Sequence, residues 1–234
     1  MQVEQLVNYL DDPQAAADWL NQLGVEDASR AHANILAMAD AGMTTDLLTI
    51  ISDQLNQHLP PLSDPDLALD SLRRFVSASR NPISLGALFE RDREALPILL
   101  QIFSTSQHFG DQLVRDPASY DLLRLTEGQP AARELLVDDI ISEVSALADR
   151  RAVVLALRSY KRRETLRIAY GDIIRGQNIE TVTRQISYLA DAVCEAALQT
   201  ALREIRDKRG TPRRHDGEPA RFVIIALGRL GGCE

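Results

Sequence analysis

The sequence of 234 residues contains little cysteine, glycine or proline and few aromatic residues. Its two cysteines, Cys194 and Cys233, are far apart and in no spacing typical of a metal site, so a disulfide-rich secreted domain is excluded and a reduced, cytoplasmic protein is expected. Only 12 glycines and 10 prolines argue against disorder and against a loop-rich all-β fold. A content of 45% hydrophobic but only 5% aromatic residues favours a sizeable core of packed helices.

Long apolar runs are missing as well. No stretch approaches the roughly 20 apolar residues of a membrane-spanning helix. The first residues, MQVEQLVNYLDD, also lack the basic and apolar regions of a signal peptide, so we expect a soluble protein with no membrane partner. The histidines are isolated, and serines such as Ser104 and Ser106 have no partner base. The sequence therefore predicts no metal site and no nucleophilic triad.

Charge is segregated along the chain, whose net charge is −8. Residues 1–149 contain 24 Asp and Glu against 9 Lys and Arg, whereas residues 150–175 contain 8 basic and 2 acidic residues. Such a basic segment can bind a nucleotide or an acidic partner. The alternative interpretation is a solvated helix face with local ion pairs, such as Lys161 with Glu164.

Apolar residues recur at helical spacing along most of the chain, which predicts an all-α fold. Asp12-Pro13, Asp64-Pro65 and Asp116-Pro117 each combine a capping carboxylate with a proline at the first helical position. Breaks at glycine and proline give a multi-helix bundle of short N-terminal helices plus three long C-terminal ones. We expect helices over 3–10, 13–23, 27–41, 44–58, 65–79, 84–91, 93–104, 106–114, 118–126, 131–148, 150–175 and 179–208.

Two of the long helices have candidate core stripes. In 131–148 the predicted stripe is Leu135, Leu136, Ile140, Val144 and Leu147. In 150–175 it is Val154, Leu157, Tyr160, Leu166 and Ile168, with arginines interleaved.

The last residues differ from all that precede them. Residues 221–227 read RFVIIAL, which predicts a strand buried on both faces, after a linker over 208–220. Gly228, Gly231 and Gly232 follow, and glycines in this position are typical of backbone that approaches a phosphate. A plain tight turn is the alternative. The Walker pattern is absent, and Ala226 occupies the first glycine position of a dinucleotide fingerprint.

The terminal segment ALGRLGGCE resembles the Gly-Lys-Leu-Gly-Gly-Arg-Glu segment of the glutamine synthetase adenylyltransferase/adenylyl-removing enzyme family, within the DNA polymerase β-like nucleotidyltransferases. Arg229 replaces the family's lysine, and Cys233 departs from its usual arginine. Residues 75–123, 157–172 and 186–191 are similar to helices of the same family, whereas residues 1–74 carry no recognisable resemblance. The matching positions of the terminal segment are Gly228, Leu230, Gly231, Gly232 and Glu234.

The resemblance implies a parent enzyme with two nucleotidyltransferase halves, each preceded by a helical region. One half transfers AMP from ATP to a tyrosine of glutamine synthetase, and the other removes it by phosphorolysis, which controls nitrogen assimilation. The implied cofactors are ATP or ADP and Mg²⁺, and the implied partners are glutamine synthetase and the PII signal protein, with no nucleic acid. An Asp-x-Asp pair beyond Glu234 would bind the metal, so no catalytic or metal residue is expected here. The implied phosphate-binding residues are Gly228, Arg229, Gly231 and Gly232.

The resemblance also gives the basic helix a possible role. Tyr160 shares a face of this helix with Arg163 and Arg167. We therefore expect Arg163 and Arg167 to support a catalytic domain, and Arg158 and Arg162 to face solvent or a partner.

We expect the chain to be an N-terminal fragment that is inactive alone. It would comprise a helical domain over 1–207, the linker over 208–220, and the start of a truncated α+β nucleotidyltransferase domain over 221–234. Because a lone strand leaves both edges unpaired, the tail beyond Arg221 should fray or pair with a foreign edge. The alternatives are a stand-alone helical interaction module and the start of a dinucleotide-binding domain.

Overall fold

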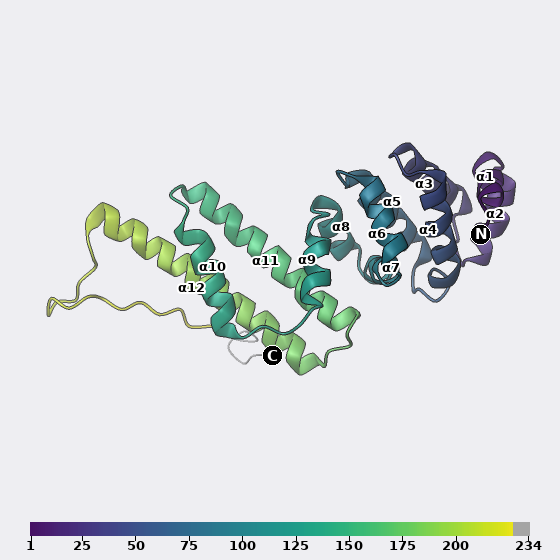
Figure 1. Ribbon diagram of the computed structural model, residues 1–234. Coiled ribbons are helices and arrows are strands. Elements are labelled where there is room, and N and C mark those ends of the chain that lie inside the picture. Colours follow the sequence, from purple (N-terminus) through teal and green to yellow (C-terminus); the bar gives the residue numbers. More distant parts are fainter. Residues whose placement is uncertain (227–234) are drawn as a thin grey trace. The chain divides into compact units, whose positions relative to one another are not determined.

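The computed structural model describes residues 1–226 and is all-α over this range, as the sequence predicts (Figure 1). It contains no strand within the described residues, only an isolated antiparallel bridge between Arg213 and Pro219. The chain divides into two compact units, residues 1–122 and 123–234.

The N-terminal unit is built from short helices. Within it α5 packs against α3, α7 and α8, and α4 packs against α1, α6 and α7. The helix α9 (Ser119–Thr126) contains the boundary between the two units. The others are α1 (Val3–Asp11), α2 (Pro13–Gln22), α3 (Ala28–Asp40), α4 (Thr45–His58), α5 (Pro65–Ala78), α6 (Pro82–Arg91), α7 (Ala95–Thr105) and α8 (Gln107–Arg115).

An aromatic cluster lies in the core of this unit. The Phe75 ring on α5 lies 5.8 Å from that of Phe103 and meets that of Tyr120 edge-on at 6.1 Å. All three side chains are almost fully buried, and the Tyr120 hydroxyl donates a hydrogen bond to the Ala95 carbonyl oxygen. Aromatic side chains contribute the largest burial per residue, so this cluster is a principal source of the unit's stability.

Capping side chains set where these helices begin. The Asp64 carboxylate accepts a hydrogen bond from the Leu67 amide at 2.8 Å, and Asp12 caps α2 in the same way, which confirms both predicted starts. Asn81 caps α6 with Pro82 as its first residue, two residues before the predicted start. The prediction for Asp116-Pro117 is wrong, because α9 begins only at Ser119, whose hydroxyl donates to Asp116.

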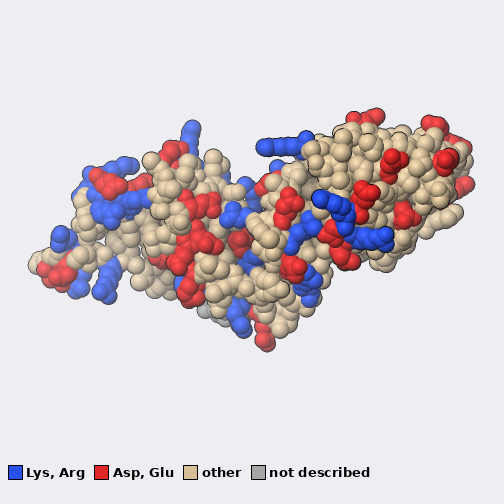
Figure 2. Space-filling view, viewed as in Figure 1, with Lys and Arg blue, Asp and Glu red and all other residues tan. Residues whose placement is uncertain are grey.

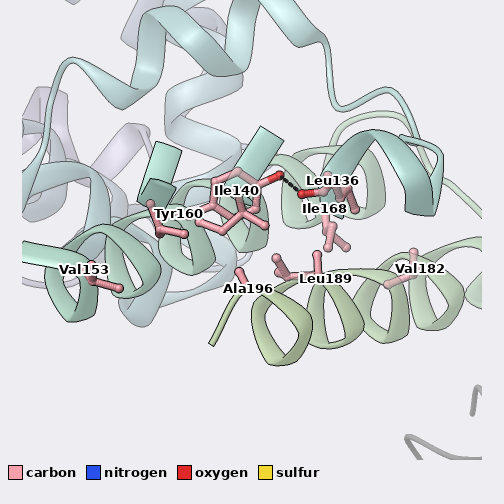
Figure 3. Close-up of a cluster of buried hydrophobic side chains, with 10 residues drawn as sticks. Leu136, Ile140, Val153, Tyr160, Ile168, Val182, Leu189 and Ala196 are labelled. Atoms are coloured by element: carbon pink, nitrogen blue, oxygen red, sulfur yellow. Dashed lines mark hydrogen bonds between the residues drawn. The ribbon is translucent and has the colours of Figure 1, made fainter. Parts of the chain in front are cut away.

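The C-terminal unit consists mainly of three longer helices, α10 (Arg133–Ser145), α11 (Arg150–Ile173) and α12 (Ile179–Arg209). The last of these packs against both α10 and α11 (Figure 1). Two fully buried alanines on α12, Ala192 and Ala196, are small enough to let the neighbouring helices approach closely. The core residues drawn in Figure 3 are Leu136, Ile140, Val144, Val153, Tyr160, Ile168, Val182, Leu189, Ala192 and Ala196.

Two residues of the predicted stripes point outward. Leu135 is 54% exposed and Val154 is 39% exposed, and the core instead contains their neighbours Leu136 and Val153. In both places adjacent positions are apolar, so periodicity alone does not decide which one faces the core. The remaining stripe residues are buried or half-buried, with Ile140, Tyr160 and Ile168 in the core. The predicted helix over 131–148 was too long at its end, because α10 ends at Ser145 and Leu147 lies just beyond it.

The chain after α12 is irregular through residue 226. The strand predicted over 221–227 is not formed over 221–226, where Val223 and Ile225 are each 77% exposed. A strand requires a neighbour that accepts and donates backbone hydrogen bonds, and the described residues supply none for this segment. The last predicted strand residue, Leu227, lies outside the described residues.

Candidate functional site

The predicted site divides into two parts. Its phosphate-binding residues, Gly228, Arg229, Gly231 and Gly232, lie outside the described residues. The part that the structure describes is the predicted basic support, Arg163 and Arg167 on α11.

Arg167 is a buried cation. Its side chain is 6% exposed, and its Nε donates to Glu164 Oε2 at 2.6 Å. One terminal nitrogen donates to Gln185 Oε1 at 2.9 Å, and the other donates to the Gln129 carbonyl oxygen. A buried charge is stable only when it is paired and hydrogen-bonded, and here all three guanidinium nitrogens are engaged. Arg167 is therefore committed to holding its neighbours in place.

The neighbours of Arg167 include the connector, defined as residues 127–132 between α9 and α10. The Gln185 side chain binds both the amide and the carbonyl of Ala131, at 2.9 and 2.8 Å. The connector is not helical, so its backbone N–H and C=O groups need hydrogen-bond partners outside a helix. Side chains of α11, of α12 and of the turn between these two helices provide such partners. The other contacts of the connector and its flank are Arg175 with Glu127 at 2.8 Å, Gln177 with the Gly128 carbonyl at 2.9 Å, and Arg133 with Asp191 at 2.7 Å.

Two glycines let the connector approach α11 closely. Gly128 has a φ of +68°, and a Cβ there would lie 2.5 Å from the Gly171 nitrogen and 2.8 Å from its Cα. A Cβ on Gly171 would in turn lie 2.7 Å from the Gln177 side chain. Backbone cannot move aside as a flexible side chain can, so only glycine fits position 128 without displacing α11.

Arg163 lies on the same side of α11 as Tyr160. Its guanidinium carbon is 5.0 Å from the centre of the Tyr160 ring, and its Nη2 is 3.4 Å from Glu143. The Tyr160 hydroxyl donates to the Leu136 carbonyl oxygen at 3.0 Å (Figure 3). Burial raises the pKa of Tyr160 well above its ordinary value, and the nearby Glu164 carboxylate raises this pKa further.

The predicted pair of Lys161 with Glu164 is wrong. Glu164 points toward the core side of the helix and pairs with Arg167, with Arg163 at 4.0 Å. The reason is burial, since Glu164 is the carboxylate that compensates the buried Arg167 cation.

The opposite side of α11 is basic and exposed. Arg158 and Arg162 face solvent as predicted, and Lys161 lies beside them. We define the outer face of α11 as Arg151, Val154, Leu155, Arg158, Lys161 and Arg162, all of which are exposed. In the view of Figure 2, the first helices carry mostly carboxylates, whereas Lys and Arg are interspersed with Asp and Glu over the C-terminal unit.

Grooves of moderate size are also present. One, of about 310 Å³, lies between the end of α10 and α12 and is lined by residues that include Ile141, Thr200 and Arg203. Arg203 donates to the carbonyl of Ser145 at 3.1 Å and so binds the C-terminal end of α10, where unpaired carbonyls attract cations.

The described residues contain no catalytic constellation. Among residues 1–226 no group of three or more His, Cys, Asp or Glu is placed to hold a metal ion. No helix among residues 1–226 combines the length and the apolar character that crossing a membrane requires.

Sequence reasoning missed Gln177 and Gln185. Gln177 gave no usable signal, because it lies in a turn. Gln185 did give one: it occupies a core position of α12 in the buried series Val182, Gln185, Leu189, Ala192 and Ala196. A polar residue in such a series indicates a buried hydrogen-bonding partner.

Comparisons with known proteins point in one direction. The sequence model of the family described as glutamate-ammonia ligase adenylyltransferase matches residues 96–234, more than half of the chain. A bifunctional glutamine synthetase adenylyltransferase/adenylyl-removing enzyme of Mycolicibacterium smegmatis is 30% identical over 232 residues, covering 94% of this chain and 22% of the relative. Enzymes of the same name from Corynebacterium diphtheriae and Pseudomonas syringae pv. tomato are each 27% identical, over 95% of this chain and 21% and 24% of theirs.

Two facts follow from these matches. The chain spans about a fifth of the length of the curated relatives that it matches. The similarity also extends into residues 1–74, since a match to 94% of the chain must include most of them, and this corrects the expectation that they carry no resemblance. No solved structure matches the chain.

Proposed function

The chain belongs to the glutamate-ammonia ligase adenylyltransferase family, and from this premise we propose that it is the N-terminal helical part of a bifunctional enzyme. That enzyme would transfer AMP from ATP to a tyrosine of glutamine synthetase and remove it by phosphorolysis. The single observation that carries the proposal is the family match over residues 96–234, which includes α10, α11 and α12.

Within this enzyme the described helices would position the catalytic domain. Arg167 and Gln185 tie α11 and α12 to the connector, and Arg163 packs on Tyr160. These contacts hold α11 and α12 in a fixed position relative to the connector. The proposed catalytic domain follows α12 and would be positioned by it. The arginines would thus act as positioning residues, because their charges are satisfied inside the fold.

The cofactors and the phosphate site belong to the proposed parent enzyme. The described residues do not fit Mg²⁺, because no carboxylate cluster is present among them. We propose that Gly228, Arg229, Gly231 and Gly232 bind the phosphates at the start of a nucleotidyltransferase domain, with an Asp-x-Asp pair beyond Glu234 as the metal ligands and PII as a regulator.

The activity of the parent enzyme tests the function. With purified glutamine synthetase as substrate, we expect the parent enzyme to transfer AMP from ATP to the protein. When phosphate is supplied, it should remove the adenylyl group again, with ADP as the product. The 234-residue chain alone should do neither, because residues 1–226 contain no group of carboxylates that could hold the metal ions. A parent that modifies another protein but leaves glutamine synthetase unchanged would refute the proposal.

Variants of the parent test the positioning role. Arg163→Ala and Arg167→Ala should each lower AMP transfer or removal severalfold or reduce stability, because both remove internal contacts. Lys161→Ala removes an exposed cation from the same helix and should impair activity and stability less than either of these substitutions. Equal effects of all three substitutions would contradict the assignment.

A further inference from the structure

The outer face of α11 is not explained by the fold. Its cations, Arg151, Arg158, Lys161 and Arg162, form no ion pair within the described part of the chain. The same helix places Arg163 and Arg167 against carboxylates on its other side, so acidic partners were available to the fold but are not used on this face.

The arrangement of these cations is unfavourable in the free helix. Arg158 and Arg162 are four residues apart and Arg158 and Lys161 three apart, so like charges are neighbours on the surface. No carboxylate occupies this face between residues 151 and 165. A bound acidic surface would remove this repulsion.

Two apolar side chains lie among the cations. Leu155 is 64% exposed and Val154 is 39% exposed, one helical turn before Arg158. Protein interfaces combine an apolar centre with a polar rim, and arginine is enriched in them. Three of the four cations are arginines, whose planar guanidinium binds carboxylates in a bidentate manner.

We propose that the outer face of α11 docks an acidic, partly apolar surface of glutamine synthetase. This inference rests on the proposed function, which supplies the identity of the partner. A protein is favoured over nucleic acid because Leu155 and Val154 lie among the cations, and exposed apolar side chains suit a protein surface better than a phosphate backbone.

Direct binding of purified glutamine synthetase to the 234-residue chain tests the proposal, with the dissociation constant measured at low and moderate salt. Salt should weaken the complex, because charges at the rim are screened. The double variant Arg158→Glu/Arg162→Glu should weaken binding about tenfold or more, and Leu155→Ser severalfold. All three positions are exposed, so circular dichroism of the variants should match that of the unchanged chain.

Matched controls separate this face from general charge and general apolarity. Lys208→Glu/Arg209→Glu reverses two exposed cations at the end of α12, and Leu135→Ser removes a leucine on α10 that is exposed to a similar degree. Neither control should change the dissociation constant by more than about twofold. Controls that weaken binding as much as the α11 variants would overturn the proposal.

Three other outcomes would also overturn it. The first is no binding of glutamine synthetase, a result that leaves the parent's catalytic activity, and hence the proposed function, separately testable. The second is binding through this face of a DNA duplex or of phosphatidylserine vesicles in place of glutamine synthetase. The third is self-association that the Arg158→Glu/Arg162→Glu variant abolishes, measured by sedimentation, since that would assign the face to a second copy of the chain.

Discussion

The two units of the chain use different means to stabilise helices. The N-terminal unit, residues 1–122, has a net charge of −11, short capped helices and an aromatic cluster around Phe75. The C-terminal unit, residues 123–234, has a net charge of +3 and long helices, and buried polar side chains tie its connector to α11 and α12. The first unit should therefore be sensitive chiefly to lost apolar volume, and the second to lost charge pairs and to backbone crowding.

The largest expected effect lies in the N-terminal unit. Phe75→Ala should lower its stability by about 3–5 kcal/mol, because the change leaves a cavity beside Phe103 and Tyr120. Amide exchange read helix by helix should show lost protection in α5, α7 and α8 and little change in α10, α11 and α12. Ile83→Ala is the control, since Ile83 is 54% exposed. An equal loss of protection throughout the chain would break the distinction between the units.

A crowded glycine gives the next largest effect, in the C-terminal unit. Gly128→Ala should destabilise it by about 3 kcal/mol, because the left-handed backbone and the contact with Gly171 both oppose a Cβ. Gly176→Ala is a close control: its φ is also positive, at +59°, but nothing lies within 4 Å of the added carbon. Gly176→Ala should therefore lower the free energy of unfolding by only about 1 kcal/mol. Similar urea midpoints for the two variants would show that the close approach of the connector to α11 is unimportant.

The buried arginine should give a somewhat smaller effect. Arg167→Met leaves the Glu164 carboxylate without its paired cation, whereas Gln185 keeps its hydrogen bonds to Ala131. The loss should cost about 2–3 kcal/mol in urea unfolding, less than for a fully buried pair, because Glu164 can regain some solvent. Lys161→Ala, an exposed change on the same helix, should stay within about 0.5 kcal/mol. Adding Glu164→Gln to Arg167→Met should recover part of the loss. No recovery would argue that Arg167 acts by packing rather than by charge.

The smallest effect appears only at high pH. The pKa of Tyr160 is raised in the folded chain above its ordinary value of 10.0, because burial disfavours the charged form, so folding favours the protonated hydroxyl. The free energy of unfolding that this pKa shift contributes is fully present below about pH 10. It is lost as the pH rises toward the folded pKa, by at most about 1.4 kcal/mol per pH unit. Urea unfolding of the unchanged chain and of Tyr160→Phe should therefore differ in pH dependence only in this alkaline range. Parallel curves would exclude this linkage.

The helices were the most predictable feature of the molecule. Eleven of the twelve helices in residues 1–226 begin and end within two residues of the predicted limits, and α10 ends three residues before its predicted end. Their ends are determined locally, by Asp12 and Asp64 as capping residues and by glycine and proline as breakers, so neighbouring residues suffice. Asp116-Pro117 is an equally good local start signal, yet α9 begins only at Ser119, so a local signal alone can mislead.

The candidate site was less predictable. The face shared by Tyr160, Arg163 and Arg167 follows from helical periodicity, and the exposure of Arg158 and Arg162 is confirmed. The partners of Arg167 could not be read in this way, since Gln129 and Gln185 lie 38 and 18 residues away in the chain. The role of the glycines at 228–232 stays a prediction.

The sequence by itself determined the helical class, the helix limits, the charge asymmetry and the family. Local hydrogen-bonding preferences and apolar spacing act over a few residues, so these features can be read from the chain alone. Only the tertiary structure decided that Leu136 rather than Leu135 faces the core, that Glu164 compensates Arg167 rather than Lys161, and that Gly128 lies against Gly171. Each of these three outcomes depends on residues that are distant in sequence and pack together in the fold. Their packing determines which side chains are buried and which charges are paired, and so sets the free energy of each arrangement.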